Sequence, residues 1–409
     1  MGSKAVAELG YRITKAGLAG ATEEELLRDF AQGAVAAGLG ISRAILIVDT
    51  LHPVHEGRVF HWKERELDAV AMTEYGRTNR GGEMQDNWQR SPFYRMLQSG
   101  QSELRIRLSN NEFDESNFAR ELRDEGHTDW LLLLDRFNES GSIGELDCMF
   151  SSFATQQPDG FTDDQIATLS RLSPVLGLAI KAVSLGRIAE TLVETYLGRD
   201  PGRRVLSGRI ERGIADRIEA ALWFSDLRSY TRITGAAPPD QIIPFLNDYA
   251  DATISSVEDA GGDVLKLIGD GTLAIFTGPT LSEACCAAIR AEGLMRERVA
   301  VLNASRNASE LPTTEPYLGL HVGEVFYGNV GSDSRLDFTV VGPAVNEASR
   351  IAAMCRSADR TILTSAAFAA AVDTGDRDAL VSVGRYALRG IERPQELFTL
   401  IREALPLTG

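Results

Sequence analysis

Apolar residues follow two different rhythms along the first part of the chain. In the segment 22–39 they recur at helical spacing, and Thr22 followed three residues later by Glu25 fits a capping box, so a helix is predicted there. Short apolar runs bounded by polar, glycine-bearing turns instead predict buried strands at 43–51, 129–137 and 145–155. This mixture is typical of an α/β or α+β domain, with a length that is usual for a sensor domain.

A much longer helical pattern follows. From Phe161 to Tyr196, apolar residues recur three to five positions apart, which predicts a helix over 163–197. Thr162 is expected to cap its N-terminus, and Pro174 is expected to kink or interrupt it. Such a helix fits equally well as a conduit into a following domain and as the terminal helix of the first domain.

A domain boundary is predicted in the segment 198–213, which is rich in Gly, Arg and turn residues. Beyond it a strand is expected over 217–227, strands and helices then alternate to the end, and 303–316 is predicted to be a loop. The chain is therefore expected to have three parts: a first domain over 1–187, a helical or turn-rich linker over 188–214, and a second domain over 215–409.

Composition narrows the class of protein. At 409 residues the chain is long enough for two or three domains, and 44% hydrophobic with 24% charged residues is typical of a folded globular protein. The net charge of −16 is opposite to the basic surface that nucleic-acid binding needs. No apolar run is expected to span a membrane, and the four cysteines form no CxxC pair. A cytoplasmic protein with no nucleic-acid or membrane partner is expected.

Two aspartates of the second domain stand at the ends of apolar runs. Asp226 follows ALWF at a predicted strand end, and Asp270 lies between Gly269 and Gly271 in a predicted tight hairpin. Each also has an ordinary interpretation, as a helix cap or a turn aspartate. If the two strands are neighbours, the two carboxylates can converge to hold Mg²⁺, which prefers hard oxygen ligands.

Three more polar residues of the second domain are candidate site residues. Asn346 and Arg350 are four residues apart, so on a helix they share one face, where an amide and a guanidinium suit an anionic transition state. Lys266 precedes Asp270 by four residues on a predicted strand. Taken singly, these residues are more often solvated surface positions.

Together these segments resemble the catalytic domain of class III nucleotidyl cyclases over about residues 215–403. The resemblance is carried by the strings ALWFSDLRSYT, KLIGDGTLAIF and GLHVGEVFYGNVGSDSRLDFTVVGPAVNEASRI. It implies a ferredoxin-like βαββαβ fold for the catalytic domain, 215–409, with Asp226 and Asp270 as the two metal-binding aspartates.

The same resemblance implies a role for five other positions. Lys266 falls on the position that reads the base, and Thr339 falls on its partner position, where many members of the family carry Asp. Asn346 would orient the ribose and Arg350 would stabilise charge on the α-phosphate, while Arg389 would approach the triphosphate. The Lys266/Thr339 combination is similar to that of bacterial-type cyclases that make cyclic AMP.

The resemblance therefore implies an adenylate cyclase, a phosphorus–oxygen lyase that converts ATP to cyclic AMP and pyrophosphate with two Mg²⁺ or Mn²⁺ ions per site. In this family the aspartates come from one catalytic domain and the other residues from its partner, so a homodimer with two equivalent sites is expected. Two alternatives stay open: a cyclase for guanine or a pyrimidine base, and a catalytically silent ligand-binding regulator.

The first domain resembles a GAF-type sensor, chiefly through the string GFTDDQIATLSRLSPVLGLAIKAV, which is similar to the closing helix of that fold. A small-molecule ligand of this domain and control of the cyclase by it are implied. His52, His55 and His61 have the chemistry to ligate haem or a metal, but isolated histidines are more often ordinary surface or core hydrogen-bonding groups.

Overall fold

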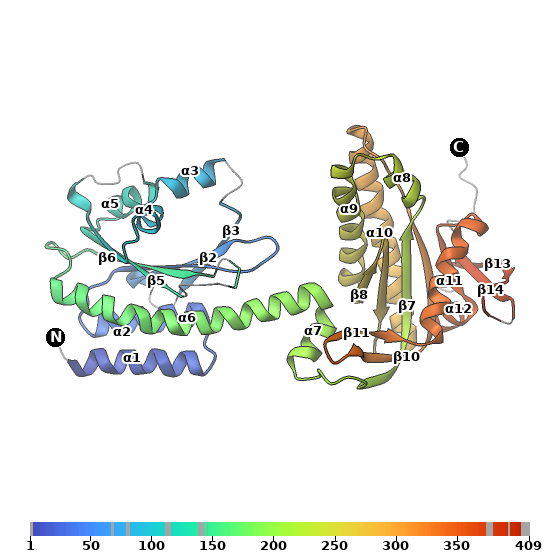
Figure 1. Ribbon diagram of the computed structural model, residues 1–409, viewed down its shortest axis with the longest axis horizontal. Helices are drawn as coiled ribbons and strands as arrows, with labels where there is room; N and C mark the ends of the chain where they lie inside the picture. The colour runs from blue at the N-terminus through green and yellow to red at the C-terminus, as the bar shows by residue number, and fades with distance from the viewer. Residues whose placement is uncertain are drawn as a thin grey trace. The chain divides into compact units, whose positions relative to one another are not determined.

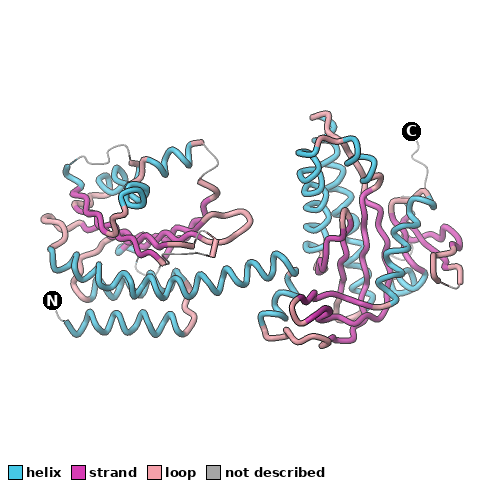
Figure 2. The backbone as a smooth tube through the Cα atoms, viewed as in Figure 1, coloured by secondary structure: helices cyan, strands magenta, loops and turns pink. Residues whose placement is uncertain are grey.

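The computed structural model divides the chain into two compact units, Met1–Leu192 and Val193–Gly409, each with its own core (Figure 1). The structure describes residues 3–66, 69–78, 82–110, 116–137, 143–144, 146–373, 379–391 and 393–401. Both units mix helices and strands (Figure 2).

The N-terminal unit is built on a six-stranded antiparallel sheet with the order β3-β2-β1-β6-β5-β4. The strands are β1 (Arg43–Asp49), β2 (Gly57–Lys63), β3 (Val70–Tyr75), β4 (Glu103–Arg107), β5 (Asp129–Arg136) and β6 (Cys148–Thr155). The predicted strands at 43–51, 129–137 and 145–155 are confirmed as β1, β5 and β6.

Helices cover both faces of this sheet. Figure 1 shows α1 (Ser3–Leu18), α2 (Glu23–Ala36) and α6 (Asp163–Leu197) on one face, and α3 (Glu83–Gln89), α4 (Pro92–Ser99) and α5 (Asn117–Asp124) on the other. Two short 3₁₀ turns, Glu64–Glu66 and Leu108–Asn110, complete the unit.

The sequence of β1 is one continuous apolar run because both faces of this strand are buried. Successive side chains point to opposite faces, so Leu46 and Val48 join the core under α1, α2 and α6. Ile45 and Ile47 join the second core, under α3, α4 and α5. A strand that is buried on both faces has no polar positions to mark its period.

The two predicted helix starts are confirmed by their caps. The Glu25 amide donates to the Thr22 hydroxyl, and the Thr22 amide donates to the Glu25 carboxylate. Thr162 and Gln165 exchange the same pair of hydrogen bonds at the start of α6. Each reciprocal pair satisfies amides that the first helical turn leaves without partners.

The expected interruption at Pro174 is wrong, because α6 continues through it to Leu197. Proline removes one backbone hydrogen bond from a helix, but Leu172, Ser173 and Leu176 around it are buried in the core. Packing of this buried face stabilises the helix more than the missing bond costs.

Of the described residues, those of α6 form one helix that is long and apolar enough to cross a membrane by length and composition, which the sequence analysis did not expect. Within its most apolar window, 44% is buried inside the protein. Core helices pass the same test, so this property alone does not make α6 a membrane span.

The C-terminal unit contains one sheet with the order β13-β14-β12-β10-β7-β9-β8, and β11 pairs with β10 outside this path. Its strands are β7 (Ala215–Leu227), β8 (Asp263–Ile268), β9 (Gly271–Phe276), β10 (Pro316–Ser332), β11 (Arg335–Val341), β12 (Ile362–Ser365), β13 (Leu380–Tyr386) and β14 (Gln395–Leu400). Its complete helices are α7 (Arg199–Leu206), α8 (Tyr230–Ala236), α9 (Pro239–Asp259), α10 (Leu281–Ala308), α11 (Pro343–Ala358) and α12 (Ala366–Ala371).

The central part of this unit has the expected βαββαβ order. The elements β7, α9, β8, β9, α10 and β10 come in this order, with the short helix α8 inserted between β7 and α9, and β10-β7-β9-β8 pair as antiparallel neighbours. One face of the sheet packs on α9 and α10, while α11 packs on the other face (Figure 1). The ends of β7 and of the β8–β9 hairpin therefore meet at one edge.

One segment agrees with its predicted conformation and one differs. The helical or turn-rich linker predicted over 188–214 contains the helix α7, which an Arg204–Asp200 ion pair supports at helical spacing. The predicted loop 303–316 begins inside α10, which runs to Ala308. Asn303 accepts a hydrogen bond from Tyr249 of α9 and donates to the Thr314 carbonyl at 2.8 Å. These contacts hold a polar segment in helical form.

Candidate active site

Asp226 and Asp270 lie together at one edge of the C-terminal sheet. Asp226 is the second-last residue of β7, and Asp270 lies in the turn between β8 and β9, as the sequence predicts. The Leu227 amide donates to Asp270 Oδ2 at 3.1 Å, which ties the turn to the end of β7. Both aspartates line a cavity of about 150 Å³.

The glycines on either side of Asp270 have structural roles. Gly269 has a φ of 65°, the left-handed conformation that glycine adopts most easily. A Cβ on Gly271 would lie 2.8 Å from the Ser225 carbonyl oxygen of β7, so a side chain there would push the hairpin away. The Gly-Asp-Gly sequence thus brings the second carboxylate close to the first.

The electrostatics of this pair fit a divalent cation. Among the described residues Asp226 Oδ1 is buried without a hydrogen-bond partner. Burial and then repulsion from Asp270 raise the pKa of Asp226 to about 6. A buried, unpartnered carboxylate oxygen beside a second carboxylate suits Mg²⁺ or Mn²⁺, which take hard oxygen ligands and leave positions for substrate phosphates.

No larger metal cluster competes with this pair, since the part of the chain that the structure describes holds no group of three or more His, Cys, Asp or Glu placed to bind one ion. His52 and His55 stack on each other, and His55 pairs with Glu74 at 3.0 Å. These histidines therefore have ordinary surface partners.

Lys266 forms an ion pair that the sequence analysis missed. Its ammonium group on β8 contacts the Asp337 carboxylate on β11, and both side chains are partly exposed. Thr339, two residues further along β11, is largely buried. Because side chains two apart on a strand share a face, Asp337 and Thr339 lie on the same side of β11.

The signal for Asp337 was present in the sequence. In RLDFTVV the polar side chains of Asp337 and Thr339 alternate with apolar ones, which is the period of a half-buried strand. The pairing with Lys266 could not be predicted, because it depends on how β11 folds back on β10 and approaches β8.

Asn346 and Arg350 lie on α11, as predicted, one turn apart. Asn346 is exposed, while the Arg350 guanidinium packs against the loop after β13, where a Cβ on Gly390 would lie 3.3 Å from Nη2. Gly390 has a φ of 75°, and its neighbour Arg389 is exposed. The structure thus brings Arg350 and the segment that carries Arg389 together.

Three groups of site residues result. The aspartates form the first, Lys266 with Asp337 and Thr339 the second, and Arg350 with the Arg389 segment the third. Of the described residues that line the aspartate cavity, none belongs to the other two groups. Within one chain, the predicted site residues therefore lie in separate places and do not share one described cavity.

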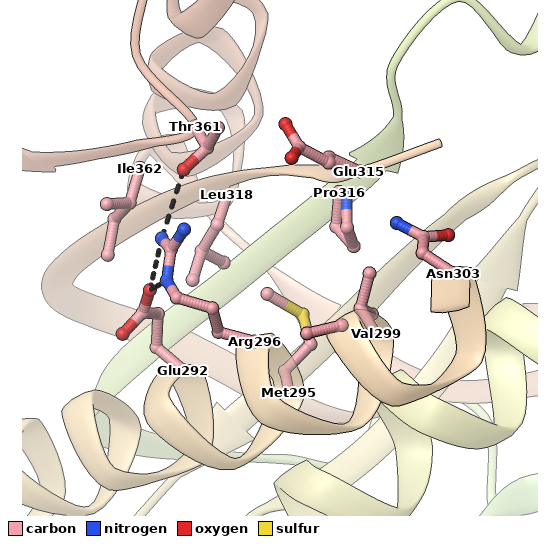
Figure 3. A pocket seen from close by; sticks show the side chains of 11 residues that line it. Glu292, Met295, Arg296, Val299, Asn303, Glu315, Pro316, Leu318, Thr361 and Ile362 are labelled. Carbon is pink, nitrogen blue, oxygen red and sulfur yellow. Dashed lines mark hydrogen bonds and ion pairs between the residues drawn. The ribbon is translucent and has the colours of Figure 1, made fainter. Parts of the chain in front are cut away.

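A separate cavity of about 100 Å³ lies between α10 and the strands β10 and β12 (Figure 3). Inside it Arg296 donates to Glu292 at 2.7 Å and to the Thr361 hydroxyl at 3.0 Å. None of the predicted site residues lines this cavity. Its polar contacts tie α10 to the start of β12, which is a structural role.

The family match to known proteins lies in the C-terminal unit. Residues 215–401 match the family model of the adenylate and guanylate cyclase catalytic domain. An adenylate cyclase of Anabaena cylindrica is 37% identical over 158 residues, which cover 38% of this chain and 31% of that protein. Adenylate cyclase 1 of Rhizobium meliloti is 30% identical over 195 residues, covering 46% and 29%.

Two solved structures are similar to part of this chain. The adenylyl cyclase CyaB from P. aeruginosa is 26% identical, with a TM-score of 0.41, over 46% of this chain and 95% of that chain. The guanylyl cyclase Cya2 is also 26% identical with a TM-score of 0.41, over 46% and 93%.

These matches leave the N-terminal unit unassigned. The chain spans only about a third of the length of the curated relatives above. The ordered motifs, the βαββαβ core and the family match agree over the same stretch of sequence. Residues 215–401 therefore form a class III adenylate/guanylate cyclase catalytic domain.

Proposed function

We propose that the protein is an adenylate cyclase, which converts ATP to cyclic AMP and pyrophosphate. The observation that carries the proposal is the pair Asp226 and Asp270 in one cavity, with a buried carboxylate oxygen that has no partner among the described residues. The names of the adenylate cyclase relatives support the same activity.

In the proposed reaction the ribose 3′-oxygen attacks the α-phosphorus. A bond forms between these two atoms, the bond from the α-phosphorus to the bridging oxygen breaks, and pyrophosphate leaves with the electron pair. The hydroxyl proton goes to solvent. Two divalent cations bound by Asp226 and Asp270 would supply acidification of the hydroxyl and neutralisation of the phosphates.

The remaining residues act on geometry and charge. Asn346 orients the ribose, and Arg350 stabilises the charge that develops on the phosphoryl oxygens, because electrostatics and positioning dominate phosphoryl transfer. Arg389 approaches the triphosphate from the segment against which Arg350 packs.

Base selection rests on Lys266 and Thr339. The Lys266 ammonium donates to a ring nitrogen of adenine, and the Thr339 hydroxyl accepts from the exocyclic amine. A guanylate cyclase is the second candidate, and one observation favours it: the Asp337 carboxylate beside Lys266 can accept from the ring N–H and amino group of guanine. A pyrimidine cyclase has no comparable support.

The active form in this proposal is a homodimer. Each chain carries the aspartates in one place and the base- and phosphate-binding residues in others, so in this proposal a two-fold pair supplies two complete sites. Exposed apolar side chains near the site, Ile243, Leu267, Ile268, Phe326 and Val341, are suited to cover by a second copy.

We also propose that the N-terminal unit is a GAF-like sensor that regulates the cyclase through α6, and that the protein acts in the cytoplasm. A silent regulator is the alternative from another class of protein. The retention of Asp226, Asp270, Asn346 and Arg350 argues for catalysis.

The first experiment identifies the product. The purified full chain is incubated separately with ATP, GTP, CTP and UTP in Mg²⁺ or Mn²⁺, and products are identified by mass spectrometry. Cyclic AMP from ATP supports the proposal, and cyclic GMP alone supports the second candidate. No cyclic product from the chain under either metal is expected of a silent regulator or of a cyclase that lacks its activating ligand. Asp270→Ala should abolish product, whereas the matched change Asp333→Ala on an exposed turn should not.

A further inference from the structure

Arg228 lies two residues beyond Asp226, at the point where the chain leaves β7. Its amide donates to the Glu315 carbonyl at 2.9 Å, which extends the ladder between β7 and β10 by one residue. Its own carbonyl accepts a hydrogen bond from the hydroxyl of the buried Thr314 at 2.6 Å. The backbone of Arg228 is therefore held at both its amide and its carbonyl, although this residue lies between β7 and α8.

The Arg228 side chain lies on the same face of the sheet as Asp226. The central carbon of its guanidinium is 6.0 Å from the centre of the Tyr317 ring. Tyr317 is the residue of β10 that lies directly opposite Asp226 in the antiparallel register. Side chains that are directly opposite in such a pair share one face of the sheet. The contact with Tyr317 therefore holds a cationic group on the face to which the Asp226 carboxylate belongs.

The residue after Arg228 has a strained backbone. Ser229 has a φ of 59° and a ψ of 22°, the left-handed conformation that is unfavourable for residues other than glycine. Strained backbone conformations are found mostly at functional sites. The strained turn ends the strand just past Arg228 and keeps this residue at the sheet edge that carries Asp226 and Asp270.

The ion pair of Arg228 is loose. Its Nη1 atom lies 3.8 Å from Glu315 Oε2, which is longer than a hydrogen bond, and both side chains are about half exposed. Exposed pairs of this kind contribute little free energy. Among the described residues that line the aspartate cavity, none is Lys or Arg. Arg228 can therefore exchange Glu315 for a more strongly charged partner beside that cavity.

We propose that Arg228 binds the β- and γ-phosphate oxygens of the nucleotide that Asp226 and Asp270 hold through divalent cations, an inference that rests on the proposed function. A triphosphate and two carboxylates carry more negative charge than two divalent cations supply, so a guanidinium beside them is favourable. Arginine pairs with phosphate through two parallel, charge-assisted hydrogen bonds. In the proposed homodimer, Arg228 comes from the same chain as the aspartates of its site.

The test measures binding of tripolyphosphate to the full chain in Mn²⁺ by calorimetry, without a nucleoside and without turnover. Arg228→Gln removes the charge and should weaken tripolyphosphate binding roughly tenfold. The matched control is Arg217→Gln, because Arg217 of β7 also pairs with a glutamate of β10, Glu324, but near the opposite end of these strands. This control should leave the affinity unchanged. Unchanged affinity in folded Arg228→Gln, judged by circular dichroism, would refute the proposal, as would no binding to the unmodified chain.

A change at Glu315 separates phosphate binding from a structural role of the ion pair. If Arg228 acts only through that pair, Glu315→Gln and Arg228→Gln should weaken tripolyphosphate binding alike. If Arg228 binds phosphate, Glu315→Gln removes a competing carboxylate and should strengthen binding about two- to threefold. Weaker binding in folded Glu315→Gln would contradict the proposal. If Arg228→Gln does not fold, the Glu315→Gln measurement decides.

Cyclase activity is a separate measurement. If the chain forms cyclic AMP, Arg228→Gln should raise KM for ATP roughly tenfold and change kcat less, because the phosphates are bound before and during the reaction. Asp270→Ala should abolish Mn²⁺-dependent tripolyphosphate binding, which ties the probe to the aspartates. A chain that forms no cyclic nucleotide but binds tripolyphosphate through Arg228 and Asp270 would argue against the proposed function and support the phosphate contact. An active chain with unchanged binding in Arg228→Gln would refute the phosphate contact alone.

Discussion

The Asp226 carboxylate is suited to bind a cation, but it lowers the stability of the metal-free protein. Its carboxylate is partly buried, one oxygen has no partner among the described residues, and Asp270 repels it. An ionised group in such surroundings destabilises the fold unless a cation joins it. The site is therefore arranged for an ion at the expense of the metal-free protein.

Replacing the Asp226 carboxylate by an amide tests both its role in activity and its effect on stability. Asp226→Asn should lower cyclase activity by about 10²–10³-fold, comparable to the loss of a charge-stabilising group. It should also stabilise the metal-free protein, by on the order of 1 kcal/mol once solvent screening is allowed for. Thermal unfolding with and without Mg²⁺ measures this, and added Mg²⁺ should raise the unfolding temperature only of the unmodified chain. A variant that is less stable without metal would contradict this account.

Asp337 is the second residue whose change is informative, because it holds Lys266 through an ion pair. Asp337→Asn removes the charge but keeps the shape, so Lys266 loses its orientation. We expect kcat/KM for ATP to fall by roughly tenfold, with unfolding temperature unchanged, since a partly exposed pair contributes little to stability. The control is Asp333→Asn, on the turn between β10 and β11, which should leave kcat/KM for ATP unchanged.

At the scale of elements, close approach of backbones fixes α11, which carries Asn346 and Arg350. Gly319 of β10 lies directly beneath this helix, and a Cβ there would lie 2.5 Å from the Ala348 carbonyl oxygen. Only glycine lets the helix and strand meet at this distance. The position of half of the predicted site therefore depends on a residue outside it.

Gly319→Ala should destabilise the protein by roughly 2–3 kcal/mol, since an overpacked contact of this kind moves backbone. It should also lower cyclase activity by displacing α11. Gly293→Ala is the matched control: Gly293 lies inside α10 with nothing near its Cβ, so alanine there should stabilise by roughly 0.5–1 kcal/mol. Chemical denaturation of both variants measures the contrast, and equal effects would contradict the packing argument.

His321 of β10 makes the stability of the protein around α12 depend on pH. His321 of β10 hydrogen-bonds Ser365, the residue that caps α12, at 2.8 Å, and lies 3.5 Å from Glu347. Burial lowers its pKa below the ordinary 6.5, although Glu347 raises it in part. The unfolded chain therefore takes up a proton more readily, and the contribution of His321 to stability is lost as pH falls below about 6.5.

Hydrogen exchange of the backbone amides of residues 365–371 measures this loss of stability at α12. Exchange of α12 should accelerate between pH 7 and pH 5, beyond the intrinsic dependence of exchange on pH, in the unmodified chain. His321→Asn keeps a group near Nδ1 without titrating, so it should flatten this excess. His52→Asn, in the other unit, should leave it unchanged. An excess that persists in His321→Asn would assign the effect to another group.

The sequence predicted elements well where local chemistry decides them. The caps at Thr22 and Thr162 and the Gly-Asp-Gly hairpin are local signals, and each is confirmed. The failures share a different cause. Pro174 inside α6 and the polar end of α10 are helical because distant residues pack or bond to them, and such contacts are invisible in a single sequence.

For the candidate site, the sequence motifs correctly placed Asp226 at a strand end and Asp270 in a hairpin turn. They also placed Lys266 on a strand, and Asn346 and Arg350 on one face of a helix. The Lys266–Asp337 pair was missed because its partners are 71 residues apart and meet only through the β10–β11 fold. The cavity between the N-terminal sheet and the helices α3, α4 and α5 was not predicted for the same reason, since its lining comes from several strands and helices. The two aspartates could be paired in advance because both belong to sequence motifs, whereas Asp337 had no such motif to connect it with Lys266.

At the scale of the whole molecule, the proposed homodimer predicts that activity depends on pairs of chains. Asp270→Ala and Arg350→Ala should each abolish activity alone, because each damages both sites of a homodimer. Mixed in equal amounts and allowed to exchange, they should recover about a quarter of full activity, since half of the dimers are mixed and each holds one intact site. Cyclic nucleotide formation measures the recovery. Mixing two Asp270→Ala samples is the control, and no recovery in the true mixture would contradict the shared site.

In the N-terminal unit the Tyr75 hydroxyl donates to the Asp49 carboxylate across Gly57, and this packing has an evolutionary consequence. The hydroxyl occupies the volume that any side chain at Gly57 would need, so the two positions cannot drift independently. A lineage that acquires alanine at 57 must give up tyrosine at 75, and with it the group that orients Asp49. Descendants that keep the Gly57–Tyr75 combination should also keep an acid at 49, and those that lose it should be free to carry other side chains there.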